Sequence, residues 1–181
     1  MRNLNAPITT TDISNDFNPQ YQWKVAEAHY KKGTAFRKAK EYNKATEEFD
    51  KAIELNPRFA NAYYSRGYVK SARGQFEEAI EEFTKTIDLN PRFILPYYSR
   101  GSIKLRFEDF DGAVEDFTEA IKLAPHLACA YNHRGTAKLM LKDYNGAIED
   151  FNKVKELDPN FNDSYVKDWQ KNALKMKKRS A

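Results

Sequence analysis

Apolar side chains between residues 76 and 89 follow the spacing of an amphipathic helix. Phe76, Ala79, Ile80, Phe83 and Ile87 recur at intervals of three and four residues, which places them on one face of a helix. The pair Asn90-Pro91 ends this segment, because proline cannot continue a helix and disfavours the helical conformation of the residue before it. Residues 60–73 are good helix formers without proline, and Gly74 follows them. We therefore expect two antiparallel helices joined by a tight turn.

The same pattern recurs at one fixed interval along the chain. A glycine, an alanine, a phenylalanine and a proline each return in the same register: Gly33, Gly67, Gly101, Gly135; Ala45, Ala79, Ala113, Ala147; Phe49, Phe83, Phe117, Phe151; Pro57, Pro91, Pro125, Pro159. The interval, for example from Gly33 to Gly67, is 34 residues. A fixed period of this length indicates a stacked array of repeats, an architecture that usually serves as a binding surface. Each glycine lies inside an expected helix, where it costs about 1 kcal/mol relative to alanine. We interpret it as a point of close contact, with the small alanine of the second helix opposite.

Composition adds constraints of its own. A hydrophobic content of 41% in 181 residues supports a packed core, and the apolar runs are too short to span a membrane. The first residues lack a signal-peptide stretch, which predicts a cytoplasmic protein. Cys129 is the single cysteine, and the three histidines are scattered, so we expect no disulfide framework, metal site or cofactor. A net charge of +4 is too small to indicate nucleic-acid binding by itself.

The repeats resemble tetratricopeptide repeats (TPR) from about Ala26 to Phe161. The family's aromatic residue four positions before the glycine is present as Tyr63, Tyr97 and Tyr131, with His29 as a departure; the aromatic residue three positions after it survives only as Phe36 and is otherwise Lys70, Lys104 and Lys138. The resemblance implies an all-α fold, a right-handed α-α superhelix (solenoid) of four TPR helix hairpins plus a C-terminal capping helix. It also implies that the first helices line a concave groove.

The resemblance and the pattern together predict the domain organisation. Residues 1–19 form a flexible N-terminal arm without periodicity. Residues 20–161 hold four tandem TPR units, at about 26–59, 60–93, 94–127 and 128–161. Residues 162–178 form an amphipathic helix that covers the open face of the last repeat, and residues 179–181 form the tail.

Helical phase predicts which side chains face the groove. Residues three before and one, four and five after each glycine share one stripe of the first helix. The candidate ligand-binding residues on this stripe are Tyr30, Thr34, Arg37, Lys38, Tyr64, Tyr68, Tyr98, Ser102, Arg106, Asn132 and Thr136. The tyrosines suit peptide recognition because they combine a large rigid face with a hydroxyl group. The alternative is that these rings pack against neighbouring helices.

Charged residues segregate between the two helices of each repeat. The first helices are rich in lysine and arginine, and the second helices are rich in glutamate and aspartate. A basic groove lined by tyrosine would favour an acidic or carboxylate-bearing peptide. The alternative is structural, with the acids stabilising helix N-termini and Arg66, Arg100 and Arg134 lying across the repeat interface.

We therefore predict a non-catalytic adaptor that binds a peptide segment of a partner protein. No glycine-rich phosphate loop is present, and Cys129 and His133 lack the third group of a nucleophilic site. Some TPR proteins grip the C-terminal carboxylate of chaperones, but the matching positions here are Tyr30, Thr34, Ser65, Leu95 and Ser99, or one repeat later Tyr64, Tyr68, Ser99, Cys129 and His133. Neither register holds that clamp, so we do not expect a chaperone cofactor of this kind.

Two other functions stay open from the sequence. The basic inner face and the lysine-rich C-terminal segment could bind nucleic acid, with tyrosines stacking on bases, although the acidic second helices argue against it. The terminal faces of the array could instead mediate self-assembly. We expect a monomer that does not associate with membranes.

Overall fold

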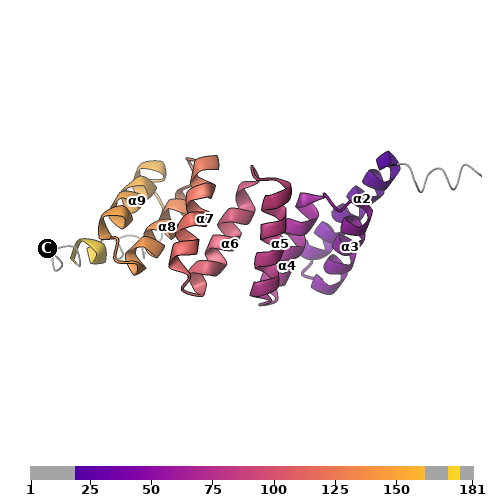
Figure 1. Ribbon diagram of the computed structural model, residues 1–181, viewed down its shortest axis with the longest axis horizontal. Helices are drawn as coiled ribbons and strands as arrows, with labels where there is room; N and C mark the ends of the chain where they lie inside the picture. The colour runs from indigo at the N-terminus through magenta and orange to yellow at the C-terminus, as the bar shows by residue number, and fades with distance from the viewer. Residues whose placement is uncertain (1–18, 162–170, 176–181) are drawn as a thin grey trace, which may run out of the picture. The chain divides into compact units, whose positions relative to one another are not determined.

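The computed structural model describes residues 19–161 and 171–175, and within these residues it contains α-helices and turns but no strand. Figure 1 shows the helices in chain order. Their bounds are α2 Pro19–Lys38, α3 Tyr42–Leu55, α4 Ala60–Ala72, α5 Phe76–Leu89, α6 Ile94–Arg106, α7 Phe110–Leu123, α8 Ala128–Met140 and α9 Tyr144–Leu157.

The chain forms two compact units that meet within α5, at Glu82 and Phe83. In the first unit α2 packs against α3, α3 packs against α4, and α2 also touches α4. In the second unit α6 packs against α7, α7 against α8 and α8 against α9, and α6 also touches α8. Because the packed pairs α2–α3, α6–α7 and α8–α9 are joined by short turns, the two helices of each pair run antiparallel.

The turn after each first helix contains one residue in the left-handed conformation. This residue is Lys40, Glu108 or Lys142, with φ of 60°, 63° and 65°, and Gly74 with φ of 81°. The amide that follows it donates to a carbonyl five residues earlier, as in the bond of 2.9 Å from Asp109 N to Lys104 O. Glycine suits this backbone best, so three of these turns carry a strained residue.

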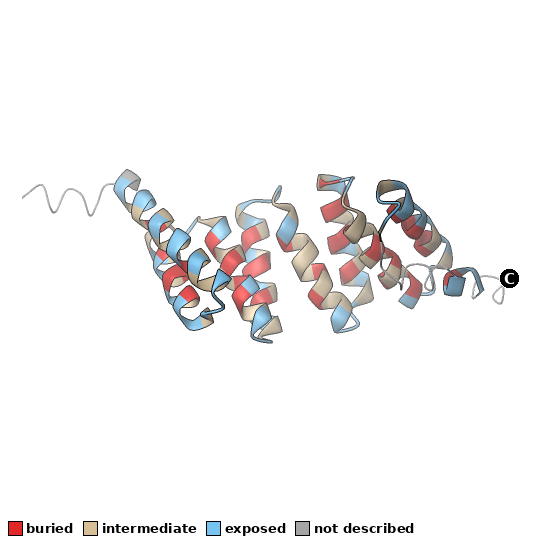
Figure 2. Cartoon of the chain, turned by 180° about the vertical axis from the view of Figure 1, so that it is seen from behind, coloured by how far each residue is buried: buried red, intermediate tan, exposed pale blue. Residues whose placement is uncertain are grey.

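Buried residues recur along the helices (red in Figure 2), and close packing inside the hairpins involves the repeated glycines. A Cβ atom added to Gly33 would lie 2.7 Å from the ring of Phe49, and one added to Gly135 would lie 2.9 Å from the ring of Phe151. Both phenylalanines are fully buried. The glycines are therefore points of close approach, as the sequence predicts, but the phenylalanine ring rather than the alanine side chain occupies the position opposite.

The predicted terminal segments are only partly described. Residues 1–18 of the arm lie outside the described residues, and Pro19 already belongs to α2. Within the predicted capping helix, residues 171–175 are helical, and Ala173 is fully buried in a cluster with Leu139 and Phe151. Residues 162–170, 176–178 and the tail lie outside the described residues. In the described part of the chain no helix is long and apolar enough to cross a membrane.

Candidate functional site

The predicted stripe residues lie on the first helices of the repeats. In the first unit Tyr30, Thr34, Arg37 and Lys38 are on α2, and Tyr64 and Tyr68 are on α4. In the second unit Tyr98, Ser102 and Arg106 are on α6, and Asn132 and Thr136 are on α8. Because α2 touches α4 and α6 touches α8, each unit can present residues from two helices on one surface.

The tyrosines of this stripe differ in exposure. Tyr30 is half-buried, with its ring centroid 5.9 Å from that of Phe49 and 5.0 Å from that of Phe59. Tyr98 is also half-buried, with its ring centroid 5.8 Å from that of Phe117, and burial raises the pKa of its hydroxyl. Tyr68, by contrast, keeps 44% of its surface exposed. The tyrosines of the stripe are therefore not equivalent, since Tyr30 and Tyr98 also pack against the core.

Arg37 links the two first helices of the first unit. Its guanidinium carbon lies 4.9 Å from the centroid of the Tyr68 ring, within the range of a cation–π interaction. Arg37 is half-buried, and its Nε is closed to solvent without a hydrogen-bond partner. The next residue, Lys38, is exposed. This pair supplies positive charge on the stripe of α2.

The small polar residues of the stripe are mostly used within their own helices. The Ser102 hydroxyl donates to the carbonyl of Tyr98 at 2.8 Å, and the Thr136 hydroxyl donates to the carbonyl of Asn132 at 3.0 Å. Asn132 itself is buried and offers little surface to a ligand. Thr34 differs from the other two hydroxyl residues, because its Oγ1 is closed to solvent and has no partner.

Most of the basic residues that the sequence assigns to the inner layer form ion pairs. A buried carboxylate directly precedes each repeated phenylalanine, at Glu48, Glu82, Asp116 and Asp150. Asp116 accepts from Arg100 Nε at 3.0 Å and from Arg100 Nη2 at 2.7 Å, and Lys104 Nζ lies 3.0 Å from it. These hydrogen bonds raise the pKa of Arg100 above its usual range. The same arrangement joins Arg66 and Lys70 to Glu82, and Arg134 and Lys138 to Asp150.

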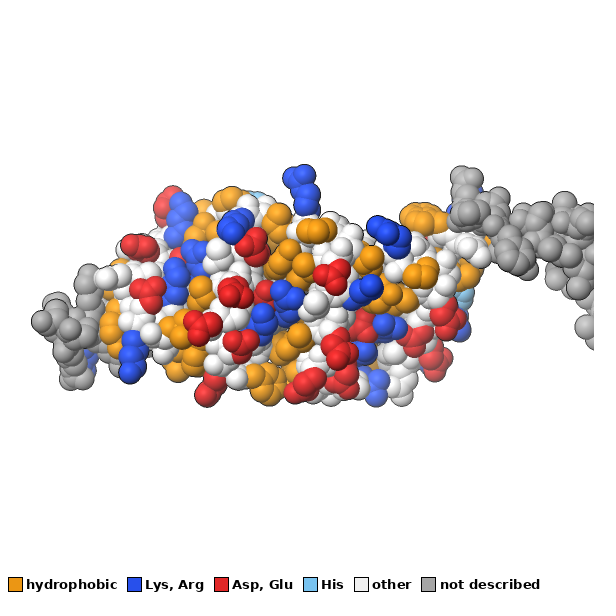
Figure 3. Space-filling view, viewed as in Figure 1, with side chains coloured by type: hydrophobic (Ala, Val, Ile, Leu, Met, Phe, Trp, Pro, Cys, Tyr) orange, Lys and Arg blue, Asp and Glu red, His pale blue; other side chains and the backbone are white. Residues whose placement is uncertain are grey.

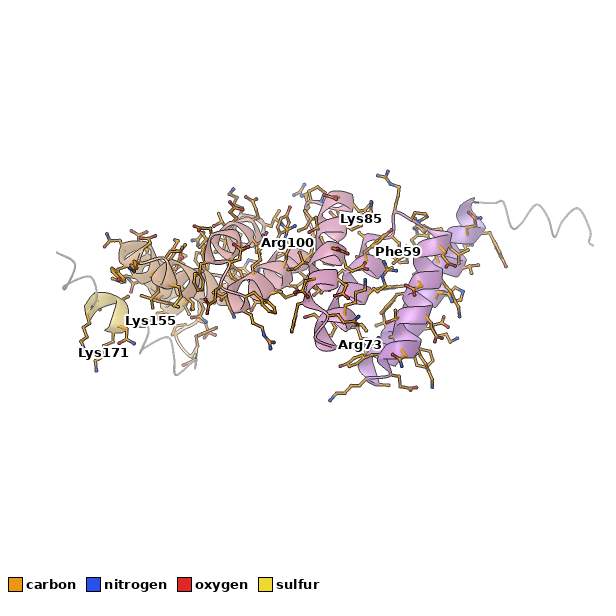
Figure 4. All side chains as sticks on the ribbon, turned by 60° about the horizontal axis from the view of Figure 1, so that its bottom comes forward. Phe59, Arg73, Lys85, Arg100, Lys155 and Lys171 are labelled. Atoms are coloured by element: carbon orange, nitrogen blue, oxygen red, sulfur yellow. The ribbon has the colours of Figure 1, made fainter. Side chains whose placement is uncertain are left out.

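The arginines of the second unit also reach the second helix of the preceding repeat. Arg100 Nη1 donates to Thr84 Oγ1 at 2.8 Å, and Arg134 Nη1 donates to Thr118 Oγ1 at 3.1 Å. The arginine stems thus cross the repeat interface, which is the structural alternative that the sequence leaves open. Figure 4 shows Arg100 within this part of the chain.

The first repeat satisfies its buried carboxylate differently. It retains Phe36 where the later repeats have lysine, and His29 Nδ1 lies 2.7 Å from Glu48 Oε2. Lys32 Nζ donates to Glu48 Oε1 at 3.0 Å. These partners, His29 first, lower the pKa of Glu48 to about 2. The first repeat therefore lacks the lysine of the later repeats at position 36, and His29 and Lys32 contact its buried carboxylate instead.

These ion pairs reduce the positive charge that the first helices offer to a ligand. In each of the three later clusters an arginine and a lysine share one buried carboxylate, which balances part of their positive charge. Acidic and basic side chains are intermixed on the face in Figure 3. The sequence carried a signal for the clusters, since an acid stands immediately before every repeated phenylalanine. The surface also includes Leu95, which lies one turn before Tyr98 on the same face of α6 and is 46% exposed.

Cys129 and His133 form no nucleophilic pair in this geometry. His133 Nδ1 lies 2.7 Å from the backbone carbonyl of Cys129 and 3.4 Å from the Tyr98 hydroxyl. The imidazole is therefore held by a carbonyl oxygen and a phenol, without the carboxylate that orients a catalytic histidine. Among the described residues, no group of three or more histidine, cysteine, aspartate or glutamate side chains could hold a metal ion.

Family profiles match most of the repeat region. Profiles described as TPR repeat or tetratricopeptide repeat match residues 33–72, 60–93, 96–127 and 128–161. The chain belongs to the tetratricopeptide repeat family. A comparison with curated protein sequences finds no match.

Solved TPR structures share the fold. A crystal structure of MamA protein has a TM-score of 0.73 at 21% identity and covers 86% of this chain and 89% of its own. PilF of Pseudomonas aeruginosa has a TM-score of 0.72 at 21% identity, covering 87% of this chain and 71% of its own. The first TPR of Spaghetti (RPAP3), bound to the HSP90 peptide SRMEEVD, has a TM-score of 0.60 at 27% identity, covering 64% of this chain and 90% of its own. The chain therefore has the all-α solenoid fold of a protein-interaction scaffold.

Proposed function

We propose that this chain is a non-catalytic adaptor that binds a peptide segment of a partner protein along the first helices of its repeats. The observation that carries the proposal is the exposure of large apolar side chains on these helices, with Tyr68 and Met140 at stripe positions and Leu95 one turn before Tyr98. Tyr68 is 44%, Leu95 46% and Met140 48% exposed. Large apolar side chains that are exposed to solvent in the free protein are typical anchors for a protein ligand.

The electrostatics of the first helices support the same function. Positions just before and three after each glycine are occupied by ion pairs in the later repeats, as for Arg100 and Lys104. The predicted stripe lies on another side of each helix and combines aromatic, apolar and hydroxyl groups, which are left for a ligand. The Spaghetti TPR, which shares 27% identity with this chain, binds a peptide that contains two glutamates and an aspartate. This favours a peptide ligand, and the positive charge of Arg37 and Lys38 favours an acidic one.

Peptide selection tests the proposal directly. The full chain is used to select binders from a displayed random peptide library, and affinities are measured by fluorescence anisotropy. A variant with Tyr68, Leu95 and Met140 changed to alanine should lose binding while keeping its helical circular dichroism. A control with alanine at Phe107 and Leu141, which are also exposed but lie in the turns after α6 and α8, should bind normally. Equal binding by both variants, or no selected peptide at all, would refute the proposal.

Nucleic-acid binding is the weaker alternative. It requires free basic side chains, whereas the arginines and lysines of three repeats are paired with buried carboxylates. Most of the lysine-rich segment, residues 176–180, lies outside the described residues. Retardation of RNA or DNA in a low-salt gel shift, with affinity falling steeply as salt rises, would favour this alternative. Self-assembly would be recognised by a mass that increases with concentration in light scattering.

A further inference from the structure

Arg37 differs from the three arginines that directly precede a repeated glycine. Arg66, Arg100 and Arg134 each donate two hydrogen bonds to a buried carboxylate. Among the described residues the side chain of Arg37 makes no hydrogen bond or ion pair, and its guanidinium stacks on the ring of Tyr68. Its Nε is closed to water as well. A buried charged donor without an acceptor is costly, and nearly all such groups in folded proteins have a partner.

A second unsatisfied group lies beside it. Thr34 precedes Arg37 by one helical turn on the same face of α2, and its Oγ1 is also buried without a partner. The corresponding hydroxyls of Ser102 and Thr136 bond to backbone carbonyls of their own helices. Within the described residues, Thr34 Oγ1 and Arg37 Nε are the two buried side-chain polar atoms that lack a partner. Their adjacency points to one missing acceptor group.

The positive charge of Arg37 indicates that the missing acceptor is an anion. Lys38 is exposed next to Arg37, and the nearest acid earlier on α2, Glu27, already pairs with Lys31 at 2.8 Å. A planar guanidinium presents two parallel N–H groups to a carboxylate, and stacking on an aromatic ring holds that plane. Tyr68 provides the ring from α4. One guanidinium and one hydroxyl match the single charge and two oxygens of a carboxylate.

We propose that Arg37, supported by Tyr68 and Thr34, is a specificity site for one carboxylate group of the bound peptide. This site rests on the proposed peptide-binding function and adds the chemistry that one ligand residue must have. A carboxylate that accepts from the Arg37 guanidinium and the Thr34 hydroxyl supplies the acceptor that these two groups lack among the described residues. The carboxylate belongs either to an aspartate or glutamate side chain or to the C-terminus of the peptide.

The test starts from peptides selected on the full wild-type chain. Each selected peptide is resynthesised with its acids changed singly to amides, and separately with an amidated C-terminus. Replacing the acid that occupies the site should weaken binding by about 10- to 100-fold, as expected for a charge-assisted hydrogen-bond pair. Loss on side-chain replacement identifies aspartate or glutamate, and loss on amidation identifies the C-terminal carboxylate. These substitutions require no protein variant, so the test does not depend on the folding of a mutant.

Protein variants then assign the effect to Arg37. Both Arg37→Gln and Arg37→Lys should weaken the acidic peptide by a similar factor, and Arg37→Gln should no longer distinguish the acid from the amide. Arg73→Gln is the matched control, because Arg73 is an exposed arginine of the same unit. Arg73 and Phe59 flank opposite ends of α4 (Figure 4). In NMR spectra of the wild-type chain, the Nε–Hε signal of Arg37 should shift on addition of the acidic peptide.

The outcomes separate the two proposals. Selected peptides that bind equally as acids and amides, or that bind the Arg37 variants normally, would overturn the carboxylate site and leave peptide binding intact. If replacing the acid by phosphoserine strengthens binding by more than about tenfold, the carboxylate site is also overturned, because the site would then prefer phosphate to carboxylate. Failure to select any peptide would overturn the proposed function and this site together.

Discussion

Replacing Asp116 by asparagine tests whether the repeated ion clusters hold the repeats together. The side chain of Asp116 is only 4% exposed and accepts from both Arg100 and Lys104. Asparagine keeps the shape but removes the charge, and one of its two side-chain groups becomes a donor that faces other donors. Two cations then remain in a partly buried place without a counter-charge.

The structure sets the size of the effect. Removing one partner of a fully buried pair costs about 3–5 kcal/mol. Arg100 and Lys104 retain 17% and 20% of their side-chain surface in water, which solvates part of their charge. We therefore expect Asp116→Asn to lower the free energy of unfolding by about 2–4 kcal/mol, a loss of about 4–16 °C in melting temperature for a chain of this size.

Urea unfolding followed by circular dichroism measures the loss, and hydrogen exchange of α6 and α7 shows whether it is local. Glu115→Gln, a charge change at an exposed neighbour on the same helix, should leave the midpoint unchanged. A combined variant with Arg100→Met, Lys104→Met and Asp116→Leu should recover to within about 1 kcal/mol of the wild type, since apolar packing can replace a buried ion cluster. An Asp116→Asn midpoint equal to that of the wild type would show that the ion cluster does not stabilise the repeats.

Three further outcomes follow from single positions. The folded-state pKa of Glu48 is about 2, below its usual 4.5, mainly through His29, so this carboxylate stabilises the fold above pH 4.5 and loses that contribution as pH falls toward 2. Glu48→Gln should flatten the acid decline of melting temperature over that interval, whereas Glu47→Gln should not. Gly135→Ala places a methyl group 2.9 Å from a fully buried phenylalanine ring, and should cost about 1–3 kcal/mol in urea unfolding. Glu108→Gly should raise the melting temperature, because glycine adopts the left-handed conformation without the cost of about 1 kcal/mol that a residue with a side chain incurs. A lower melting temperature would show that Glu108 is not strained.

The candidate site was only partly accessible from sequence. Helical phase correctly places Arg37 and Tyr68 on the first helices of their repeats, but it does not reveal that they stack on each other. It also gives Tyr30 and Tyr68 equal rank, although one ring packs on Phe49 and the other is largely exposed. Phase fixes which face of a helix a residue occupies and leaves open what lies opposite.

The repeat length, the helix hairpins and the need for a small residue at Gly33 and its equivalents could be inferred from the order of residues alone. These features depend on local spacing, which recurs in register and is readable from one chain. Which charged side chains form pairs depends on helix packing, because Arg100 meets Asp116 across two packed helices rather than along one. Among the described residues the same packing leaves Arg37 without an acidic partner, so the chemistry available to a ligand depends on contacts between helices that no pattern along the chain records.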